Sequence, residues 1–341
     1  MAKPEKLPPN QFDHFYKGGY KIGSLRGGPG GPMRPEEWIG STTTRYGETD
    51  TGLSKLSSGE LLVDVIGRES EAWLGREHLN TFGSSTEILV KLLDPDQALP
   101  VHFHPTRKFA KEHLGVSHGK TEAWIIVDAP AGAKVGLGFK KEMSKTEVLP
   151  LVAGKQSQAI IDSLEFFEVK PGDAFFVPSG IPHAIGAGIF VMEMQEPTDY
   201  SGLLEWEGFA VDGEKDGHYD LGFDILLDDL RYSPLNKNEI EKWITHDRLN
   251  ASTDVNIFSE SANPYFRANY LSGKVSSVEA GFAIFLALSG QGRANFENAG
   301  EMEISRGEAV VIPHSAGGWT LTGVGGILTR PPLPHYARLA Q

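Results

Sequence analysis

Short apolar runs separated by glycine and proline make up most of the hydrophobic pattern of this chain. Runs of this kind, bounded by turn-forming residues, are typical of β-strands. The 40 glycines and 21 prolines are spread along the whole sequence, as expected when turns join many short strands. We expect strands at residues 61–65, 86–92, 123–127, 159–161, 174–177, 189–194, 265–271, 282–288, 309–312 and 326–328.

Two helical patterns interrupt the strands. In residues 222–233 the apolar side chains recur at positions i, i+3, i+4 and i+7, which share one face of a helix. Residues 236–248 form a similar face through Ile240 and Trp243. The pattern therefore predicts a partly helical connector, residues 201–258, between two groups of strands.

A glycine-rich stretch near the N-terminus, residues 17–32, invites comparison with phosphate-binding loops. It lacks the Gly-Lys-Ser/Thr ending of such loops, and no clear strand precedes it. We expect a flexible loop there.

The composition narrows the class of protein. With 341 residues, the chain is long enough for two domains or for one large β unit with decorations. It contains no cysteine, so neither a disulfide framework nor a thiolate ligand is available. Acidic residues outnumber basic ones, 45 to 32, and the formal net charge of −13 argues against nucleic acid as a partner.

The same acidic balance argues against an anionic membrane as a partner. No apolar run reaches the roughly 18 residues that span a bilayer, and the first ten residues lack the apolar centre of a signal peptide. We therefore expect a cytoplasmic protein that acts on a small molecule, as a monomer or a homodimer.

Four potential metal ligands lie in strand-like sequence. His102 and His104 stand two residues apart, and alternate residues of a strand face the same way. Glu122 precedes an apolar run, and His183 follows a Pro-Ser-Gly-Ile-Pro turn. Three imidazoles and one carboxylate suit a catalytic transition metal with exchangeable positions. The sequence thus predicts a metal site on neighbouring strands.

These segments resemble known families. Residues 172–183, Gly-Asp-Ala-Phe-Phe-Val-Pro-Ser-Gly-Ile-Pro-His, match the second signature of the cupin β-barrels. Residues 101–105, Val-His-Phe-His-Pro, and residues 119–122, Gly-Lys-Thr-Glu, are similar to the metal-site segments of type I mannose-6-phosphate isomerases. The resemblance covers most of the chain, and further segments that carry it are residues 36–41, 195–199, 289–292 and 306–313.

The resemblance implies a mainly β bicupin, with two jelly-roll-type barrels and a short helical connector. An N-terminal segment, residues 1–84, would add strands to the first barrel. The further divisions would be a metal-binding cupin domain at residues 85–200, the connector at 201–258 and a degenerate cupin domain at 259–341. His314 has no His-x-His partner upstream, so we expect no metal in the second barrel.

The family's activity is the interconversion of mannose 6-phosphate and fructose 6-phosphate through an enediolate, with a divalent metal that stabilises the developing charge. The resemblance implies one zinc per chain, although the donors would also accept another divalent transition metal. Lys120 faces the same side of its strand as Glu122 and could orient the substrate. Asp199 and Glu196, in the segment after the last ligand, are the candidates for proton transfer, with Glu205 as a fallback.

Two positions depart from the family pattern. His102 stands where the family usually has glutamine, which keeps a neutral nitrogen donor in place. No arginine occurs in the six residues after Asp199, where the family commonly has one that serves the substrate phosphate or catalysis. Other cations would have to replace it, and the candidates are Arg107, Lys108, Lys120 and Arg267.

Three alternatives remain open at this point. The chain could isomerise another sugar, phosphorylated or not, or it could be a sugar-binding cupin without catalytic activity. It could also be a cupin dioxygenase, which uses three histidines and one glutamate. The dioxygenase glutamate usually follows the His-x-His motif closely, whereas Glu122 comes 18 residues after His104. This spacing favours the isomerase.

Overall fold

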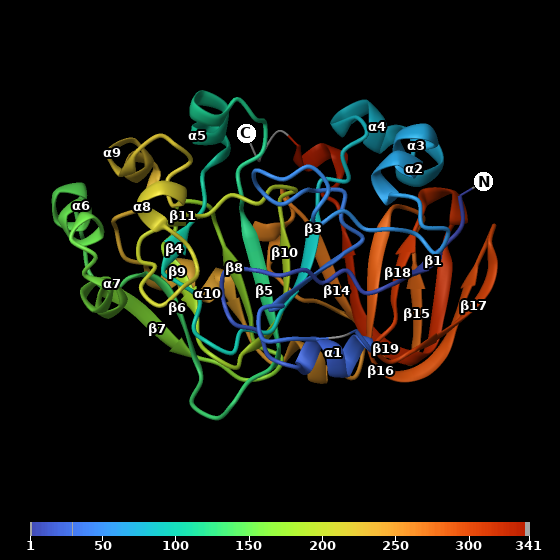
Figure 1. Ribbon diagram of the computed structural model, residues 1–341. Coiled ribbons are helices and arrows are strands. Elements are labelled where there is room, and N and C mark those ends of the chain that lie inside the picture. The colour runs from blue at the N-terminus through green and yellow to red at the C-terminus, as the bar shows by residue number, and fades with distance from the viewer. Residues whose placement is uncertain (1, 29, 338–341) are drawn as a thin grey trace.

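The computed structural model describes residues 2–28 and 30–337, which form three antiparallel sheets with helices at their margins (Figure 1). Two of the sheets lie face to face. The six-stranded sheet has the order β12 (Ile244–Thr245), β8 (Ala174–Val177), β5 (Glu122–Asp128), β10 (Phe190–Gln195), β3 (Leu89–Leu93) and β2 (Glu36–Ile39). The five-stranded sheet has the order β11 (Gly202–Leu203), β4 (His102–Phe103), β9 (His183–Ile185), β6 (Lys134–Phe139) and β7 (Leu164–Glu168).

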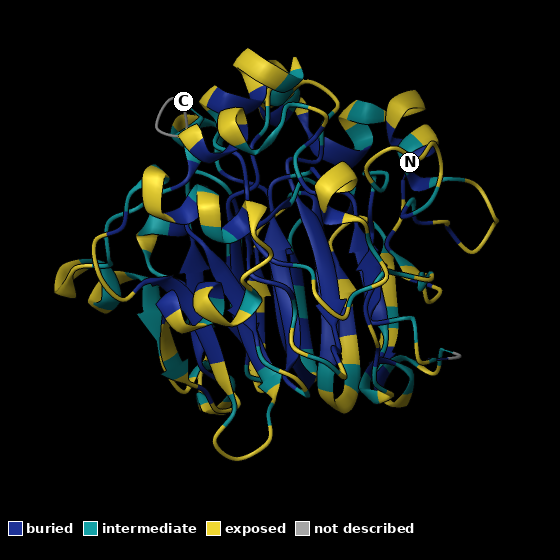
Figure 2. Cartoon of the chain, turned by 60° about the vertical axis from the view of Figure 1, so that its left-hand side comes forward, coloured by how far each residue is buried: buried dark blue, intermediate teal, exposed yellow. Residues whose placement is uncertain are grey.

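The core between these two sheets is apolar. Trp124 and Val191 of the six-stranded sheet pack with Leu137 and Ile185 of the five-stranded sheet, and all four are buried. Alternate residues of each strand point to this interior, so polar side chains that share the alternation are buried with them. The central strands are dark blue, and hence buried, in Figure 2, whereas the edge strand β7 is largely exposed.

The third sheet, on the right of Figure 1, is built mainly from the C-terminal part of the chain. Its path runs β1 (Glu5–Leu7), β18 (Ala309–Ile312), β16 (Ala283–Phe296), β19 (Trp319–Arg330), β14 (Arg267–Leu271) and β13 (Val255–Asn256). β15 (Val275–Val278) pairs with β19, and β17 (Gly300–Ser305) pairs with β16. The N-terminal segment therefore completes two sheets, because β1 pairs with β18 and β2 pairs with β3.

The helices are short and lie outside the sheets. They are α1 (Lys21–Arg26), α2 (Leu62–Arg68), α3 (Ser70–Leu74), α4 (Arg76–Phe82), α5 (Arg107–Phe109), α6 (Lys145–Ala153), α7 (Ser157–Ser163), α8 (Gly213–Asp216), α9 (Phe223–Leu226) and α10 (Lys237–Trp243). A π-helical turn, η1 (Ala110–Leu114), and 3-10 turns complete the set: η2 (Leu227–Asp229), η3 (Arg248–Asn250), η4 (Glu260–Ala262), η5 (His314–Ala316) and η6 (Pro334–Tyr336). In the described part of the chain, none of these helices is long and apolar enough to cross a membrane.

The predicted mainly β class is confirmed, and eight of the ten expected strands overlap observed ones. Two were wrong. Residues 61–65 form the start of helix α2 rather than a strand, and residues 159–161 lie within helix α7. In α2 the buried residues are Leu62, Val65 and Ile66, and this spacing is helical rather than alternating.

Both connector helices exist, but both are shorter than predicted, and the second ends at Trp243, where β12 follows. The α-helical part of residues 222–233 is α9, followed by the turn η2, and Leu230 is already extended. α10 begins after Asn236, whose side chain accepts from the Glu239 backbone N–H while the Glu239 carboxylate accepts from the Asn236 N–H. This capping box fixes the start of the helix. The connector also contributes β11, β12 and β13 to the three sheets.

The expectation of a flexible loop at residues 17–32 was wrong, because this stretch contains α1. The helix begins where the Asp94 carboxylate, next to β3, accepts hydrogen bonds from the N–H groups of Lys21 (2.5 Å) and Ile22 (3.4 Å). It ends at Gly27, which has φ +73°. A partner distant in sequence thus provides the N-terminal cap that the local pattern lacks.

One large apolar cluster joins the six-stranded and eight-stranded sheets. It brings Ile125 and Met192 together with Ile284, Leu286 and Phe266. The two halves therefore share a core, and the division into two cupin barrels stays a prediction.

The shared core leads to a stability prediction. Ile284→Ala removes fully buried methylene groups and should lower the free energy of unfolding by about 2–5 kcal/mol. Urea unfolding followed by far-UV circular dichroism and by tryptophan fluorescence should give one coincident transition. Val275→Ala, at an exposed strand position, is the control and should change stability by no more than about 0.5 kcal/mol. Two separate transitions would contradict a shared core.

Candidate metal centre and substrate cavity

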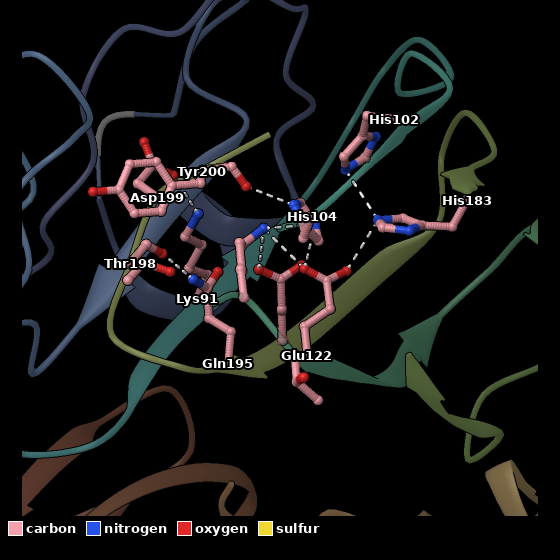
Figure 3. Close-up of polar contacts among 12 residues, drawn as sticks. Lys91, His102, His104, Glu122, His183, Gln195, Thr198, Asp199 and Tyr200 are labelled. Carbon is pink, nitrogen blue, oxygen red and sulfur yellow. Dashed lines mark hydrogen bonds and ion pairs between the residues drawn. The ribbon is translucent and has the colours of Figure 1, made fainter. Parts of the chain in front are cut away.

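The three predicted histidines and Glu122 converge from the two facing sheets, the five-stranded and the six-stranded one (Figure 3). His102 on β4 lies directly opposite His183 on β9, and His104 follows β4 by one residue. Glu122 begins β5 in the facing sheet. All four side chains are buried, with Glu122 fully inaccessible. The structure thus brings together residues that are up to 81 positions apart.

Turns beside the strands hold these residues in place. Gly180 of the Pro-Ser-Gly turn has φ +82°, and its N–H donates to the His104 carbonyl at 2.8 Å. A Cβ atom at this position would strain the backbone and lie 3.0 Å from the Asp229 carbonyl oxygen, so glycine is required. On the other side, the Lys120 N–H donates to the Pro105 carbonyl at 3.0 Å. The turn and the His-x-His strand are therefore one hydrogen-bonded unit.

The distances within the cluster are short. The Nε2 atoms of His102 and His183 are 3.1 Å apart. The Glu122 Oε2 atom lies 2.8 Å from His104 Nε2, and Oε1 lies 3.4 Å from His183 Nε2. One ligand atom from each histidine falls within 4.8 Å of the others, so the three could hold a metal ion together.

Each histidine presents a lone pair to the cluster. Its Nδ1 faces a backbone carbonyl, which can only accept, so the proton resides on Nδ1 and Nε2 is unprotonated. The acceptors are the carbonyls of Pro100 for His102 (2.8 Å), Tyr200 for His104 (2.6 Å) and Ile181 for His183 (2.8 Å). In this tautomer the 3.1 Å contact between His102 and His183 joins two acceptors, which a cation would stabilise.

Burial keeps the cluster in a metal-binding protonation state. Desolvation lowers the pKa of His104 and of His183 to about 3, and that of His102 well below its usual value. Burial alone would raise the pKa of Glu122, but the neighbouring Lys120 and His104 hold it well below the usual value. Three neutral imidazoles and a carboxylate suit a divalent transition metal.

Lys120 is the cation that the structure places beside this cluster. Its Nζ lies 2.8 Å from Glu122 Oε2 and 3.0 Å from His104 Nε2, and the side chain is buried. Lys120 lies two residues before Glu122, ahead of the start of β5, and its ammonium group contacts the Glu122 carboxylate. Lys120 therefore balances part of the negative charge and adjoins the predicted ligands.

A cavity of about 500 Å³ opens next to the cluster, and His102 and Lys120 form part of its wall. This volume is within the usual range of small-molecule sites, roughly 300–1,000 Å³. Asp199 lines the cavity. Burial alone would raise the pKa of Asp199, but the charge of Lys91 outweighs this effect and lowers it. The Nζ of Lys91 lies 3.1 Å from Asp199 Oδ1 and 3.5 Å from Glu36 Oε2.

Sequence reasoning missed two buried charged residues of this cavity, Lys91 and Glu193. They are direct cross-strand partners on β3 and β10, and both line the cavity. Burial, with the charge of Glu122 added, raises the pKa of Glu193 to about 8. The signal was present in the sequence, because each is the single charged residue within an apolar strand, Leu-Val-Lys-Leu-Leu and Phe-Val-Met-Glu-Met.

Other predicted residues lie elsewhere. The Glu196 carboxylate accepts from Arg107 and from the Thr121 N–H (2.8 Å) and is not among the described residues that line the cavity. Glu205, also outside this lining, accepts from the Val101 N–H at 3.0 Å.

Of the four cations predicted to bind a substrate phosphate, Lys120 alone is among the described residues that line the cavity. Arg107 is engaged by Glu196, and Arg267 lies on the eight-stranded sheet, where it donates to the Pro331 carbonyl at 2.9 Å. Neither these two nor Lys108 is among the described residues of the cavity wall. His314 is exposed at the start of η5.

Comparisons with known proteins agree in fold and in sequence. No family model matches the chain. The mannose-6-phosphate isomerase of Streptococcus mutans is 28% identical over 258 residues, 72% of this chain and 76% of that protein. Mannose-6-phosphate isomerase ManA of Bacillus subtilis is 36% identical over 132 residues, which cover 38% of this chain but only 41% of the relative.

Solved structures extend the match to nearly the whole chain. The mannose 6-phosphate isomerase from Bacillus subtilis has a TM-score of 0.76 at 21% identity, covering 96% of this chain and 99% of that one. A point mutant of phosphomannose isomerase from Salmonella typhimurium has a TM-score of 0.71 at 16% identity, with coverages of 97% and 100%. At these identities the structures establish the fold. Together with the sequence matches, they show that the chain is similar in sequence and in fold to mannose-6-phosphate isomerases.

Proposed function

We propose that this chain is a metal-dependent aldose–ketose isomerase that interconverts mannose 6-phosphate and fructose 6-phosphate. The observation that carries the proposal is the set of three Nε2 lone pairs and one carboxylate beside a cavity of sugar-binding size. The relatives that share sequence with the chain bear the name of this activity.

His102, His104, Glu122 and His183 would hold the metal, and zinc is the ion we propose. A bound divalent ion supplies positive charge that stabilises an enediolate. Carbonyl acceptors orient all three imidazole rings through their Nδ1–H groups, so little reorganisation is needed on binding.

Glu193, which lines the cavity near Lys120, is the group we propose for proton transfer between the adjacent carbons. In the metal-free protein, burial and the charge of Glu122 raise its pKa to about 8, and a carboxyl group that exchanges protons near neutral pH can act as a general acid/base. Its Oε1 atom lies 3.9 Å from Lys120 Nζ. Lys120 would then donate to a substrate oxygen while Glu193 moves the proton.

The other two predicted catalytic residues take different parts in this proposal. Asp199 lines the cavity with a lowered pKa, so it would bind and orient substrate and Lys91 rather than act as the base. Glu196 would be a positioning residue, because its carboxylate holds the Thr121 backbone next to both Lys120 and Glu122.

A second candidate is the isomerisation of an unphosphorylated sugar. It is favoured by three acidic residues that also line the cavity, Asp212, Asp216 and Asp220. Carboxylates at the wall disfavour a dianion and readily accept hydrogen bonds from sugar hydroxyls.

Loss of a ligand should remove metal and activity together. We expect His183→Ala and Glu122→Gln to lose most of the bound metal and to lower kcat/KM by more than about 100-fold, because even partners of metal ligands commonly contribute 10- to 100-fold. Metal content by mass spectrometry and turnover of mannose 6-phosphate are measured on the same preparation. His314→Ala, at an exposed histidine, is the control. Full activity in a metal-depleted variant would contradict the proposal.

Glu193→Gln tests the proton-transfer assignment through pH. In the metal-free protein the folded pKa is about 8 against a usual 4.5, so between these values the unfolded chain releases a proton that the folded chain keeps. The contribution of Glu193 to stability should therefore fall as pH rises through this window, by up to about 1.4 kcal/mol per pH unit, while the buried histidines with lowered pKa values contribute in the opposite direction below about pH 6.5. Glu193→Gln should lose this slope and should lower kcat by about 100-fold or more.

The measurement is urea unfolding of chelator-treated protein at pH 5.5 and 7.5, with the exposed Glu303→Gln as control. The assignment fails if wild type and Glu193→Gln show the same pH dependence and comparable turnover.

A further inference from the structure

We infer that Arg45 binds the phosphate group of the substrate, in place of the arginine that this chain lacks after Asp199. The inference rests on the proposed function and assigns the residue that determines preference for a phosphorylated sugar. Arg45 belongs to the loop that follows β2 and lines the cavity beside the candidate metal centre.

The other cations of the cavity wall are engaged or poorly placed. Lys91 contacts two carboxylates, those of Glu36 and Asp199. Lys120 is held at the predicted metal ligands. Lys215 is exposed on the short helix α8, next to Asp216. Among the described residues of the cavity wall, Arg45 and Lys215 are therefore the cations that remain for an anionic group, and Lys215 stands beside the carboxylate of Asp216 on an exposed helix.

The contacts of Arg45 itself are long and few. Its side chain is 27% exposed, and Nη1 lies 3.2 Å from the Asp13 carbonyl and 3.4 Å from Glu48 Oε1. A guanidinium has five N–H donors. Both of these contacts use Nη1, which leaves the rest of the fork for a phosphate, the group that arginine binds best in a bidentate manner.

Arg45 stands where two cavities meet. A second cavity, of about 640 Å³, shares Arg45, Tyr46, Gly47 and Asp199 with the first. Its wall adds small hydroxyl side chains, among them Thr44. A sugar with its reacting carbons at the metal centre could thus extend its far end to this junction, where hydroxyl donors and a cation surround it.

The loop that carries Arg45 is held in position. The Arg45 N–H donates to the Thr51 carbonyl at 2.8 Å, and the Tyr46 N–H donates to Asp199 Oδ2 at 3.2 Å. The Tyr46 ring packs edge-on against Tyr200 and Tyr219, at centroid distances of 5.4 and 5.8 Å. A residue fixed in this way binds a ligand with a smaller entropy loss.

A buried histidine beside Arg45 supports a built site. His14 lines the same cavity with a side chain that is 8% exposed, and among the described residues its Nδ1 has no hydrogen-bond partner. Its Nε2 lies 3.4 Å from Glu36 Oε1, so a proton on Nε2 faces the carboxylate and Nδ1 keeps its lone pair. That lone pair can accept a hydrogen bond from a sugar hydroxyl next to the phosphate.

Steady-state kinetics of Arg45→Gln and Arg45→Lys on mannose 6-phosphate and on free mannose test the inference. For Arg45→Gln we expect KM for the phosphorylated sugar to rise roughly 10- to 100-fold, the size of one lost charge-assisted hydrogen-bond pair. KM for free mannose and metal content should not change, and inhibition by inorganic phosphate should weaken in parallel. Arg45→Lys keeps the positive charge but not the forked pair of N–H donors, so its KM for mannose 6-phosphate should lie between the values of the wild type and Arg45→Gln.

Arg34→Gln is the matched control, because this arginine pairs with Asp13 and is not among the residues that line either cavity. An unchanged KM for mannose 6-phosphate in Arg45→Gln, or a rise in Lys215→Gln instead, overturns the inference and leaves the isomerase intact. Wild-type turnover of free mannose alone also overturns it. Wild-type protein that isomerises neither sugar refutes the proposed function itself.

Discussion

Three imidazole lone pairs and a carboxylate meet as buried groups at the edge of a cavity, and the site is organised around this constraint. The backbone carbonyls of Pro100, Ile181 and Tyr200 take the Nδ1 protons, so the facing Nε2 atoms have no proton to share. Acceptors held 3.1 Å apart at low dielectric repel each other unless a cation joins them. The fold therefore positions the metal-binding atoms before any metal is bound, and a bound cation would remove the repulsion between them.

The sheets make this arrangement possible. Each candidate ligand lies on or directly after a strand whose neighbouring side chains are buried in the apolar core, and this fixes the direction of the polar side chains. Two further strands, β3 and β10, bury the cross-strand pair Lys91 and Glu193 beside the cavity. Single buried charges are costly, but a network in which each partner is satisfied can be tolerated and fixes one geometry. The proposed metal binding and proton transfer would thus depend on the strand register that also brings the two facing sheets together.

Local patterns predicted the β class and singled out the four residues that the structure brings together as a candidate metal site, since strand alternation and the turn before His183 are encoded within a few residues. Features that depend on distant contacts were not predicted. Helix α1 needs Asp94 as its N-terminal cap. Arg45 reaches the cavity because the long N-terminal segment packs against the two facing sheets. Lys91 and Glu193 could have been singled out as charges within apolar strands, although their pairing follows only from the sheet order.

The most direct test of the metal-dependent isomerase is one preparation assayed for mannose 6-phosphate isomerisation and for bound metal, before and after chelation and again after zinc is restored. The account predicts about one metal ion per chain, loss of turnover with the metal, and recovery with zinc. Undiminished turnover in metal-free protein would contradict it, and so would a fully loaded protein that isomerises no sugar.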